Sequence, residues 1–284
     1  MKKKLFLVGI LLIFGLASVT NEIKIENNMA KHLVHLAKEN PEILDKFPEL
    51  GNENYKLEKM DTINFVFKNL GSDVLKSFPY IIILIILFFS SASLFKLMKS
   101  KIIRDMSLRT SYDKVIKREI IKAYSYSFVP ILFLVILFIL SLFYNVNFDF
   151  KDSCIKNINC YMSDTSLKFF FFLIFNLITI TLYYINISLI MLNYNKNIVL
   201  NVISSFLIII GIELVLQCLV GPILAAITNI QSFGNVFSSA NLWYYDSSSY
   251  LIATIYCILS FLISYIILRN TYKKKERIFI QNDK

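Results

Sequence analysis

Residues 169–192 read FFFFLIFNLITITLYYINISLIML. None of these 24 positions is Asp, Glu, Lys or Arg, and phenylalanine, isoleucine and leucine dominate them. A helix needs about 20 predominantly apolar residues to cross the hydrocarbon core of a bilayer. The stretch therefore predicts a transmembrane helix.

Five other stretches of similar composition approach or reach this length. They are residues 5–20, 79–97, 123–146, 198–219 and 249–268. Of the 284 residues, 56% are apolar and 18% are charged, and the mean hydropathy is +0.59. Soluble domains carry about a quarter charged residues. We therefore expect an all-α polytopic membrane protein, with residues 1–284 forming a single transmembrane domain built as a six-helix bundle.

The first of these stretches supports two interpretations. Residues 5–20 follow three lysines, and small residues lie near its end at Ala17 and Ser18. This arrangement is typical of a secretory signal peptide as well as of a membrane anchor. Cleavage would remove one span without moving the others.

The distribution of charge predicts the orientation. If both termini are cytoplasmic, the inner segments hold 19 basic and five acidic residues, while the outer segments hold 11 basic and 14 acidic ones. An excess of lysine and arginine in cytoplasmic loops is the positive-inside rule. The net charge of +10 is therefore interpreted as orientation in a membrane rather than as affinity for nucleic acid.

The longest outer segment is residues 21–77, which is too short for a rich core of its own. Asn28 is placed to cap a helix that Pro41 ends, and we expect the segment to cover the outer face of the bundle, with substrate binding as a further possibility. His32 and His35 share a helix face at a spacing that can chelate a metal. The competing interpretation is that they are surface histidines that bind no metal, which requires no further ligands nearby.

The four cysteines divide into two pairs by location. Cys154 and Cys160 lie in the second outer loop, where an oxidising compartment favours a disulfide between them. Cys218 and Cys257 fall within predicted spans, where we expect them to pack as small apolar residues.

The inner loop at residues 96–122 is basic and helical in pattern. Its apolar residues recur at intervals of three and four, with a break at Arg109-Thr110-Ser111, where Ser111 is placed to cap the helix that follows. Two short helices are expected to protrude from the inner surface. The simplest interpretation is a juxtamembrane segment attracted to anionic lipid.

Three phrases resemble the permease subunit of a type-2 ATP-binding-cassette transporter. The first runs from Ser111-Tyr112-Asp113-Lys114-Val115 through Ala123-Tyr124, the second is YNKNIV at 194–199, and the third is the basic end ISYIILRNTYKKKER at 263–277. Six spans with both termini inside also agree with that family. The resemblance covers nearly the whole chain.

The resemblance implies that the inner loop is a coupling helix for a separate ATPase subunit. The residues that it assigns to this contact are Arg104, Asp105, Met106, Arg109, Thr110 and Ser111. Met106 and its apolar neighbours would anchor the contact, and the charges would set its register. The implied assembly is a homodimer or heterodimer of permease subunits with two ATPases in the plasma or inner membrane of a bacterium, exporting an amphipathic peptide, lipid or drug-like molecule.

Two features near the fifth span bear on a substrate route. Glu213 is the one acidic residue within a predicted span, and Gln217 follows one turn later. Intramembrane carboxylates are functional candidates by default, although an ordinary structural glutamate near the outer interface is the competing interpretation. The apolar segment 220–248, with its aromatic run at 243–245, is expected to be re-entrant or interfacial.

The fourth span carries several polar side chains, which we expect to form hydrogen bonds between helices. They are Asn176, Thr179, Thr181, Asn186 and Ser188. No phosphate-binding loop, dinucleotide fingerprint or hydrolase motif occurs in the chain. We therefore expect no enzymatic activity and no cofactor in this subunit. A non-transporting membrane organiser is the alternative, because residues 122–130 also resemble Yip-domain membrane proteins.

Overall fold

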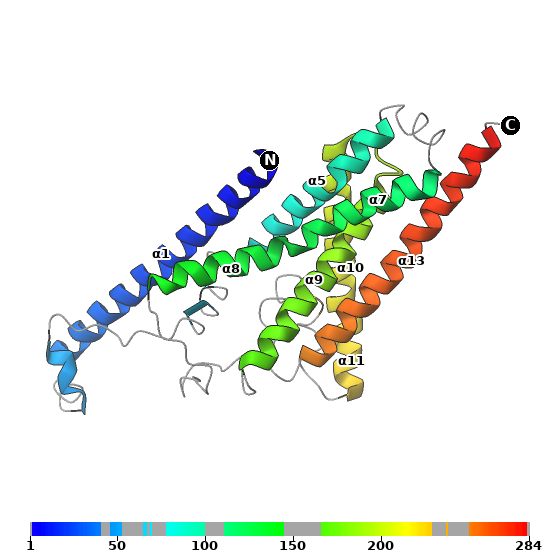
Figure 1. The fold of residues 1–284 in the computed structure, drawn as a ribbon. Helices are drawn as coiled ribbons and strands as arrows, with labels where there is room; N and C mark the ends of the chain where they lie inside the picture. Colours follow the sequence, from blue (N-terminus) through cyan, green and yellow to red (C-terminus); the bar gives the residue numbers. More distant parts are fainter. Residues whose placement is uncertain are drawn as a thin grey trace. The chain divides into compact units, whose positions relative to one another are not determined.

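The computed structural model describes residues 2–40, 46–52, 65–66, 69, 78–99, 111–144, 166–228, 237 and 250–282. Within these ranges the chain is helical, with turns between helices and no strand. Six helical stretches are long and apolar enough to cross a membrane (Figure 1). They are Phe6–Glu39, Pro79–Lys99, Tyr112–Leu142, Phe171–Met191, Ile198–Thr228 and Leu251–Lys273. The prediction of an all-helical, multi-pass architecture is therefore confirmed at this level.

The chain divides into two compact units. Unit 1 combines Met1–Lys76 with Phe133–Ser153, and unit 2 combines Ser77–Leu132 with Cys154–Lys284. Each unit is described separately below.

Unit 1 is built on α1 (Lys2–Glu39), a 38-residue helix. At about 1.5 Å per residue it is nearly twice as long as the hydrocarbon core is thick. The helix continues through residue 20 and through Asn28. The prediction of a separate helix that begins at Asn28 is therefore wrong. A polar residue caps a helix only where the chain enters from a non-helical conformation, and here the chain arrives already helical. The expected end before Pro41 is correct, because α1 stops at Glu39.

The interior of unit 1 joins α1 to part of α8 (Val129–Leu142). A Cβ placed on Gly15 would lie 3.0 Å from Leu140 Cδ1 and 3.3 Å from Ile136 Cγ2, so the two helices meet closely at this glycine. Ser18 Oγ donates to Asn69 Oδ1 at 3.0 Å. Close approach at a small residue is a common basis for helix packing in membranes.

Near the other end of unit 1, Tyr144 secures the turn after α8. Its hydroxyl donates to Glu26 of α1, and its ring stacks on Phe65 with centroids 4.0 Å apart. The short helix η1 (Pro48–Gly51) adds buried Leu50 to this unit and contacts α1.

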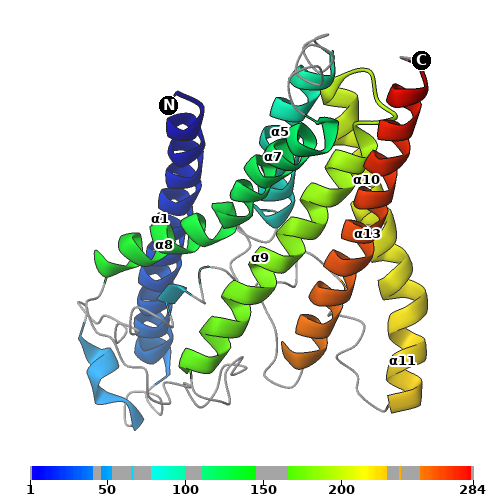
Figure 2. The same cartoon turned by 45° about the vertical axis from the view of Figure 1, so that its right-hand side comes forward.

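Unit 2 is organised around α9 (Ser166–Met191), the most enclosed of the six candidate spans. Helices α5 (Phe78–Lys99), α10 (Ile198–Val215) and α13 (Tyr250–Asn282) contact it. Figure 2 shows α13 running beside α9 over much of its length. The side chains on α9 that face these neighbours are therefore enclosed by protein.

The helix α7 (Tyr112–Tyr124) begins where the break at Ser111 predicts. Ser111 occupies the position before the first helical residue, but its side chain makes no capping bond. Its backbone carbonyl accepts from Lys114 N at 3.0 Å and from Val115 N at 3.3 Å. A single turn, η2 (Ser125–Phe128), then leads into α8, so helical structure runs from Tyr112 to Leu142.

The fifth span continues beyond its expected end. After α10 come the π-helical turn η3 (Leu216–Val220) and α11 (Gly221–Thr228), which together extend the helical stretch to Thr228. The sequence favours a stop at Gly221-Pro222, because proline lacks an N–H and clashes with the carbonyl four residues earlier. That expectation is wrong, since the wider π turn directly before Pro222 is a way for a helix to accommodate such a break.

Candidate functional site

A buried row of polar side chains on α9 connects the helices of unit 2. We call Tyr184, Asn186 and Ser188 the polar seam, because each bonds to a neighbouring helix. All three are buried, with Asn186 and Ser188 fully inaccessible to solvent. In an apolar environment such groups must be paired to avoid a desolvation penalty.

The first contact of the polar seam pairs a tyrosine with the intramembrane glutamate. Tyr184 Oη donates to Glu213 Oε1 on α10 at 3.0 Å. Glu213 is 4% exposed. The rings of Tyr183 and Tyr184 lie 5.4 Å apart, and α13 contributes Tyr256, whose hydroxyl is within electrostatic reach of Glu213. One carboxyl group thus accepts a hydrogen bond from one tyrosine and has two more tyrosines within electrostatic reach.

The second contact joins three helices through one amide. Tyr124 Oη of α7 donates to Asn186 Oδ1 at 2.6 Å, and Asn186 Nδ2 donates to Ser264 Oγ of α13 at 2.9 Å. Ser264 Oγ in turn donates to Phe261 O at 2.9 Å. The end of α7 is therefore fixed to both α9 and α13.

The third contact uses the serine of the polar seam. Asn201 Nδ2 on α10 lies 3.2 Å from Ser188 Oγ and 3.3 Å from Ser188 O. Ser188 Oγ is 3.5 Å from Leu87 O of α5, which is at the outer limit for a hydrogen bond. This contact places α5 and α10 against the same turn of α9.

Only some of the polar side chains in the fourth predicted span form hydrogen bonds to other helices. Asn186 and Ser188 do so, as expected. Thr179 and Thr181 instead donate to Phe175 O and Leu177 O of their own helix. Threonine hydroxyls reach the carbonyl of the preceding turn, which satisfies them without a neighbour. Asn176 is 1% exposed, and neither of its side-chain polar atoms has a hydrogen-bond partner within the described ranges.

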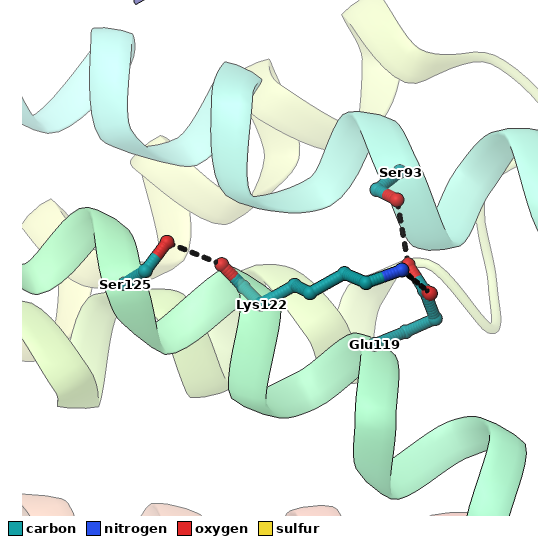
Figure 3. A network of polar contacts seen from close by, with 4 residues as sticks. All are labelled: Ser93, Glu119, Lys122 and Ser125. Atoms are coloured by element: carbon teal, nitrogen blue, oxygen red, sulfur yellow. Dashed lines mark hydrogen bonds and ion pairs between the residues drawn. The ribbon is translucent and has the colours of Figure 1, made fainter.

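A charged contact ties α7 to α5 (Figure 3). Ser93 Oγ donates to Glu119 Oε2 at 2.6 Å, and Lys122 Nζ forms an ion pair with Glu119 Oε1. The backbone carbonyl of Lys122 also accepts from Ser125 Oγ at 2.7 Å. Glu119 is buried, so its pairing to a lysine and a serine is the arrangement that makes burial of the carboxylate tolerable.

The opposite face of α7 is open. Its exposed side chains are Lys114, Lys117, Arg118, Ile121 and Lys122, and Ile121 is 69% exposed. Lys117 pairs with Asp113 one turn away. An exposed isoleucine surrounded by basic groups is suited to contact with either a protein or a lipid surface.

Many of the expected functional residues lie outside the described ranges. These include Arg104, Asp105, Met106, Arg109 and Thr110 of the inner loop, and Cys154 and Cys160 of the expected disulfide. Of the inner-loop set, only Ser111 is described, at the start of α7. Most of the expected re-entrant segment is also outside, and its described beginning, Gly221–Thr228, is helical.

The other sequence candidates fall in three environments. Gln217 is half-buried within the π turn, one turn beyond Glu213. His32 and His35 are exposed on α1, and no group of three potential metal ligands occurs among the described residues. Cys257 is buried as expected, whereas Cys218 is exposed and does not pack inside unit 2. A cysteine on the outward side of the π turn has no interior to fill.

Four residues of the polar seam and its contacts were missed by sequence reasoning. Tyr184, Tyr124, Asn201 and Ser264 carry its bonds, yet none of them forms a local motif with its partner. The available signal was the occurrence of polar groups in otherwise apolar spans. That signal identifies one end of each contact but not the other.

No protein-family model, curated protein or solved structure matches this chain significantly.

Proposed function

We propose that this chain is the membrane permease subunit of a transporter powered by a separate ATP-binding-cassette ATPase. The proposal is supported by the sequence phrases described above and by six helices able to cross a membrane. In the proposed orientation, both termini and residues 96–122 lie on the cytoplasmic side of a cell membrane. The ATPase would dock on this inner loop.

The single observation that carries the proposal is the fixation of α7 within unit 2. This helix forms the second half of the inner loop and is held at Glu119 by Ser93 of α5. It is held again at Tyr124 by Asn186 of α9, which also binds Ser264 of α13. A displacement of the loop would therefore be transmitted to three helices through hydrogen bonds, which is what a coupling element has to achieve.

The exposed face of α7 is also suited to binding a protein partner on the cytoplasmic side of the membrane. Ile121 supplies an apolar contact, and Lys114, Lys117 and Arg118 supply positive charge around it. Together with Met106 and Arg109 in the preceding segment, they would form one docking surface with an apolar centre and a charged rim.

The proposed route runs past Glu213, where α10 faces α9, and continues past Gln217 in η3. Glu213 is enclosed in the conformation seen here, so a substrate would pass only after α9 and α10 separate. Export of an amphipathic peptide, lipid or drug-like molecule by a dimer of permease subunits is the form of transport that the resemblance implies. Such a molecule would use both the apolar helix faces and the few polar groups between them.

The test is to purify the tagged chain from its native membrane in mild detergent and identify the proteins that accompany it. We expect an ATPase to copurify. Charge reversal at Lys114, Lys117 and Arg118, or the pair Met106→Ala and Arg109→Ala, should remove it at least tenfold. Charge reversal at Lys31 and Lys38, which are exposed on α1, is the matched control and should retain it.

Repeated recovery of the folded chain without any ATPase would contradict the proposal. That result would favour the non-transporting membrane organiser. Retention of the ATPase by both α7 and inner-loop variants would place the docking surface elsewhere.

A further inference from the structure

Asn176 differs from the other asparagines of α9 and its immediate neighbours. Asn186 and Asn201 donate from their amide nitrogens to side chains of other helices, and Asn193 donates to Ile190 O at 3.0 Å. Asn176 is 1% exposed, and among the described residues neither its amide nitrogen nor its amide oxygen has a hydrogen-bond partner. A buried amide without partners carries a desolvation penalty. The conformation seen here therefore leaves a donor and an acceptor on α9 that a ligand could pair.

The helical turns around Asn176 offer little to a water molecule. Leu173 and Ile180, each about one turn away, are apolar and buried. The Thr179 hydroxyl donates within the helix, to Phe175 O at 2.8 Å. A buried water molecule typically makes about three hydrogen bonds, and these side chains would leave most of them unmade. A ligand that brings apolar surface together with its own polar groups suits this position better.

The two unused groups of Asn176 match the backbone of a peptide. In an extended chain the N–H and C=O of one residue point to the same side, as they do in the paired residues of antiparallel strands. A carboxamide has an acceptor and a donor side by side and can bond to both. An ester-linked lipid offers acceptors only, so it would leave the Asn176 oxygen unpaired. Of the substrate classes considered for the transporter, an apolar peptide satisfies both atoms.

Asn176 also lies on the part of α9 where the proposed route runs. Tyr183 follows it by seven residues, which is close to two full turns, so the two side chains share a face of the helix. Tyr183 is buried and lies within electrostatic reach of Glu213 on α10. A molecule that passes Glu213 between α9 and α10 would therefore pass this face as well.

We propose that Asn176 binds the backbone of a transported apolar peptide. Its Nδ2 donates to a backbone carbonyl of the peptide and its Oδ1 accepts from a backbone N–H. Because Asn176 is enclosed in the conformation seen here, the peptide reaches it when α9 separates from a neighbouring helix. Binding pairs the amide, so the peptide favours the separated conformation over the closed one. This inference rests on the proposed function, since it names the substrate class of that transporter.

The first test measures thermal unfolding of the purified full chain in lipid nanodiscs, without an ATPase. The probe is acetyl-trileucine amide, and a ligand that binds the folded chain raises its unfolding temperature. We expect the probe to raise the unfolding temperature of the wild type by several degrees and that of Asn176→Leu not at all. Leucine has nearly the shape of asparagine without its polar atoms. Without the probe, this variant should therefore unfold at the same temperature as the wild type or higher.

The matched control is Thr181→Val on the same helix. Thr181 is buried, and its hydroxyl donates to Leu177 O at 2.6 Å, so it has no need of a ligand. This variant should keep the full shift that the probe produces in the wild type.

A second probe tests the donor of the peptide in the wild-type chain itself. It is the same tripeptide with ester linkages in place of the amides between its leucines, which removes the N–H groups that Asn176 Oδ1 would accept from. We expect this ester analogue to raise the unfolding temperature by less than half as much as the amide probe does.

Equal shifts in the wild type and Asn176→Leu would overturn the proposal, as would equal shifts with the two probes or no shift in the wild type. A loss of stability in Asn176→Leu without the probe, combined with an unchanged probe shift, would make Asn176 a structural residue and also overturn it. Peptide binding by a chain that recovers no ATPase would contradict only the proposed function. Copurification of an ATPase with a chain that binds no peptide would contradict only this inference.

Discussion

Asn186 connects three helices with one side chain. Its amide oxygen accepts from Tyr124 and its amide nitrogen donates to Ser264, so α7, α9 and α13 meet at a single residue. Hydrogen bonds between membrane helices average about 0.6 kcal/mol and reach about 1.7 kcal/mol. Loss of both bonds also leaves two hydroxyl groups without this partner.

Asn186→Ala is therefore expected to reduce the free energy of unfolding by about 1–3 kcal/mol. The measurement is a denaturing-detergent titration of the purified chain, followed by circular dichroism. Thr271→Val is the control, because the Thr271 hydroxyl bonds within its own helix, to Ile267 O at 2.8 Å, and should change stability little. Equal losses in the two variants would show that the bonds made by Asn186 contribute nothing specific.

Individual residues were predictable from the sequence only where their chemistry conflicts with their surroundings. Glu213 is conspicuous as a charge within an apolar span, and Asn186 and Ser188 as polar groups in another. Their partners were not predictable, because Tyr184 is 29 positions from Glu213, and Ser264 is 78 positions from Asn186. No local pattern encodes which side chains meet across such separations.

At the scale of the element, Gly15 sets how closely α1 and α8 approach within unit 1. A side chain at this position would meet Leu140 and Ile136 at 3.0–3.3 Å. By contrast, a Cβ added to Gly9 on the same helix has no atom within 4 Å. The two glycines therefore form a matched pair for testing this packing.

We expect Gly15→Leu to reduce the free energy of unfolding by about 1–3 kcal/mol, because overpacking forces side chains and backbone to shift. Gly9→Leu should be neutral or slightly stabilising, since leucine has the higher helix propensity and open space surrounds the site. The same detergent titration measures both. A larger loss for Gly9→Leu than for Gly15→Leu would contradict the close contact described here.

Helices were predictable as elements because long apolar runs define them, but their ends were less so. Pro41 and the break at Ser111 mark real boundaries, whereas Gly221-Pro222 and Asn28 do not. Whether a proline ends a helix depends on whether neighbouring turns can widen, and η3 does so before Pro222. Residue type alone does not determine this outcome.

At the scale of the whole molecule, composition and charge predict a multi-pass membrane protein with a defined orientation. The six apolar helices agree with the prediction of a multi-pass membrane protein. Orientation is a property of charges relative to a bilayer, so it remains a prediction from the sequence. The proposed function depends on it, because an ATPase can reach residues 96–122 only from the cytoplasm.

The most direct test of this account is the side of the membrane on which α7 lies. Single cysteines replace Lys117 of α7 and Lys38 of α1, both exposed, in a chain whose four native cysteines are changed to serine, and intact cells are treated with a membrane-impermeant maleimide. We predict labelling at position 38 in intact cells and at position 117 only after the membrane is permeabilised. Labelling of position 117 in intact cells would contradict the orientation, and with it the docking of an ATPase on this loop.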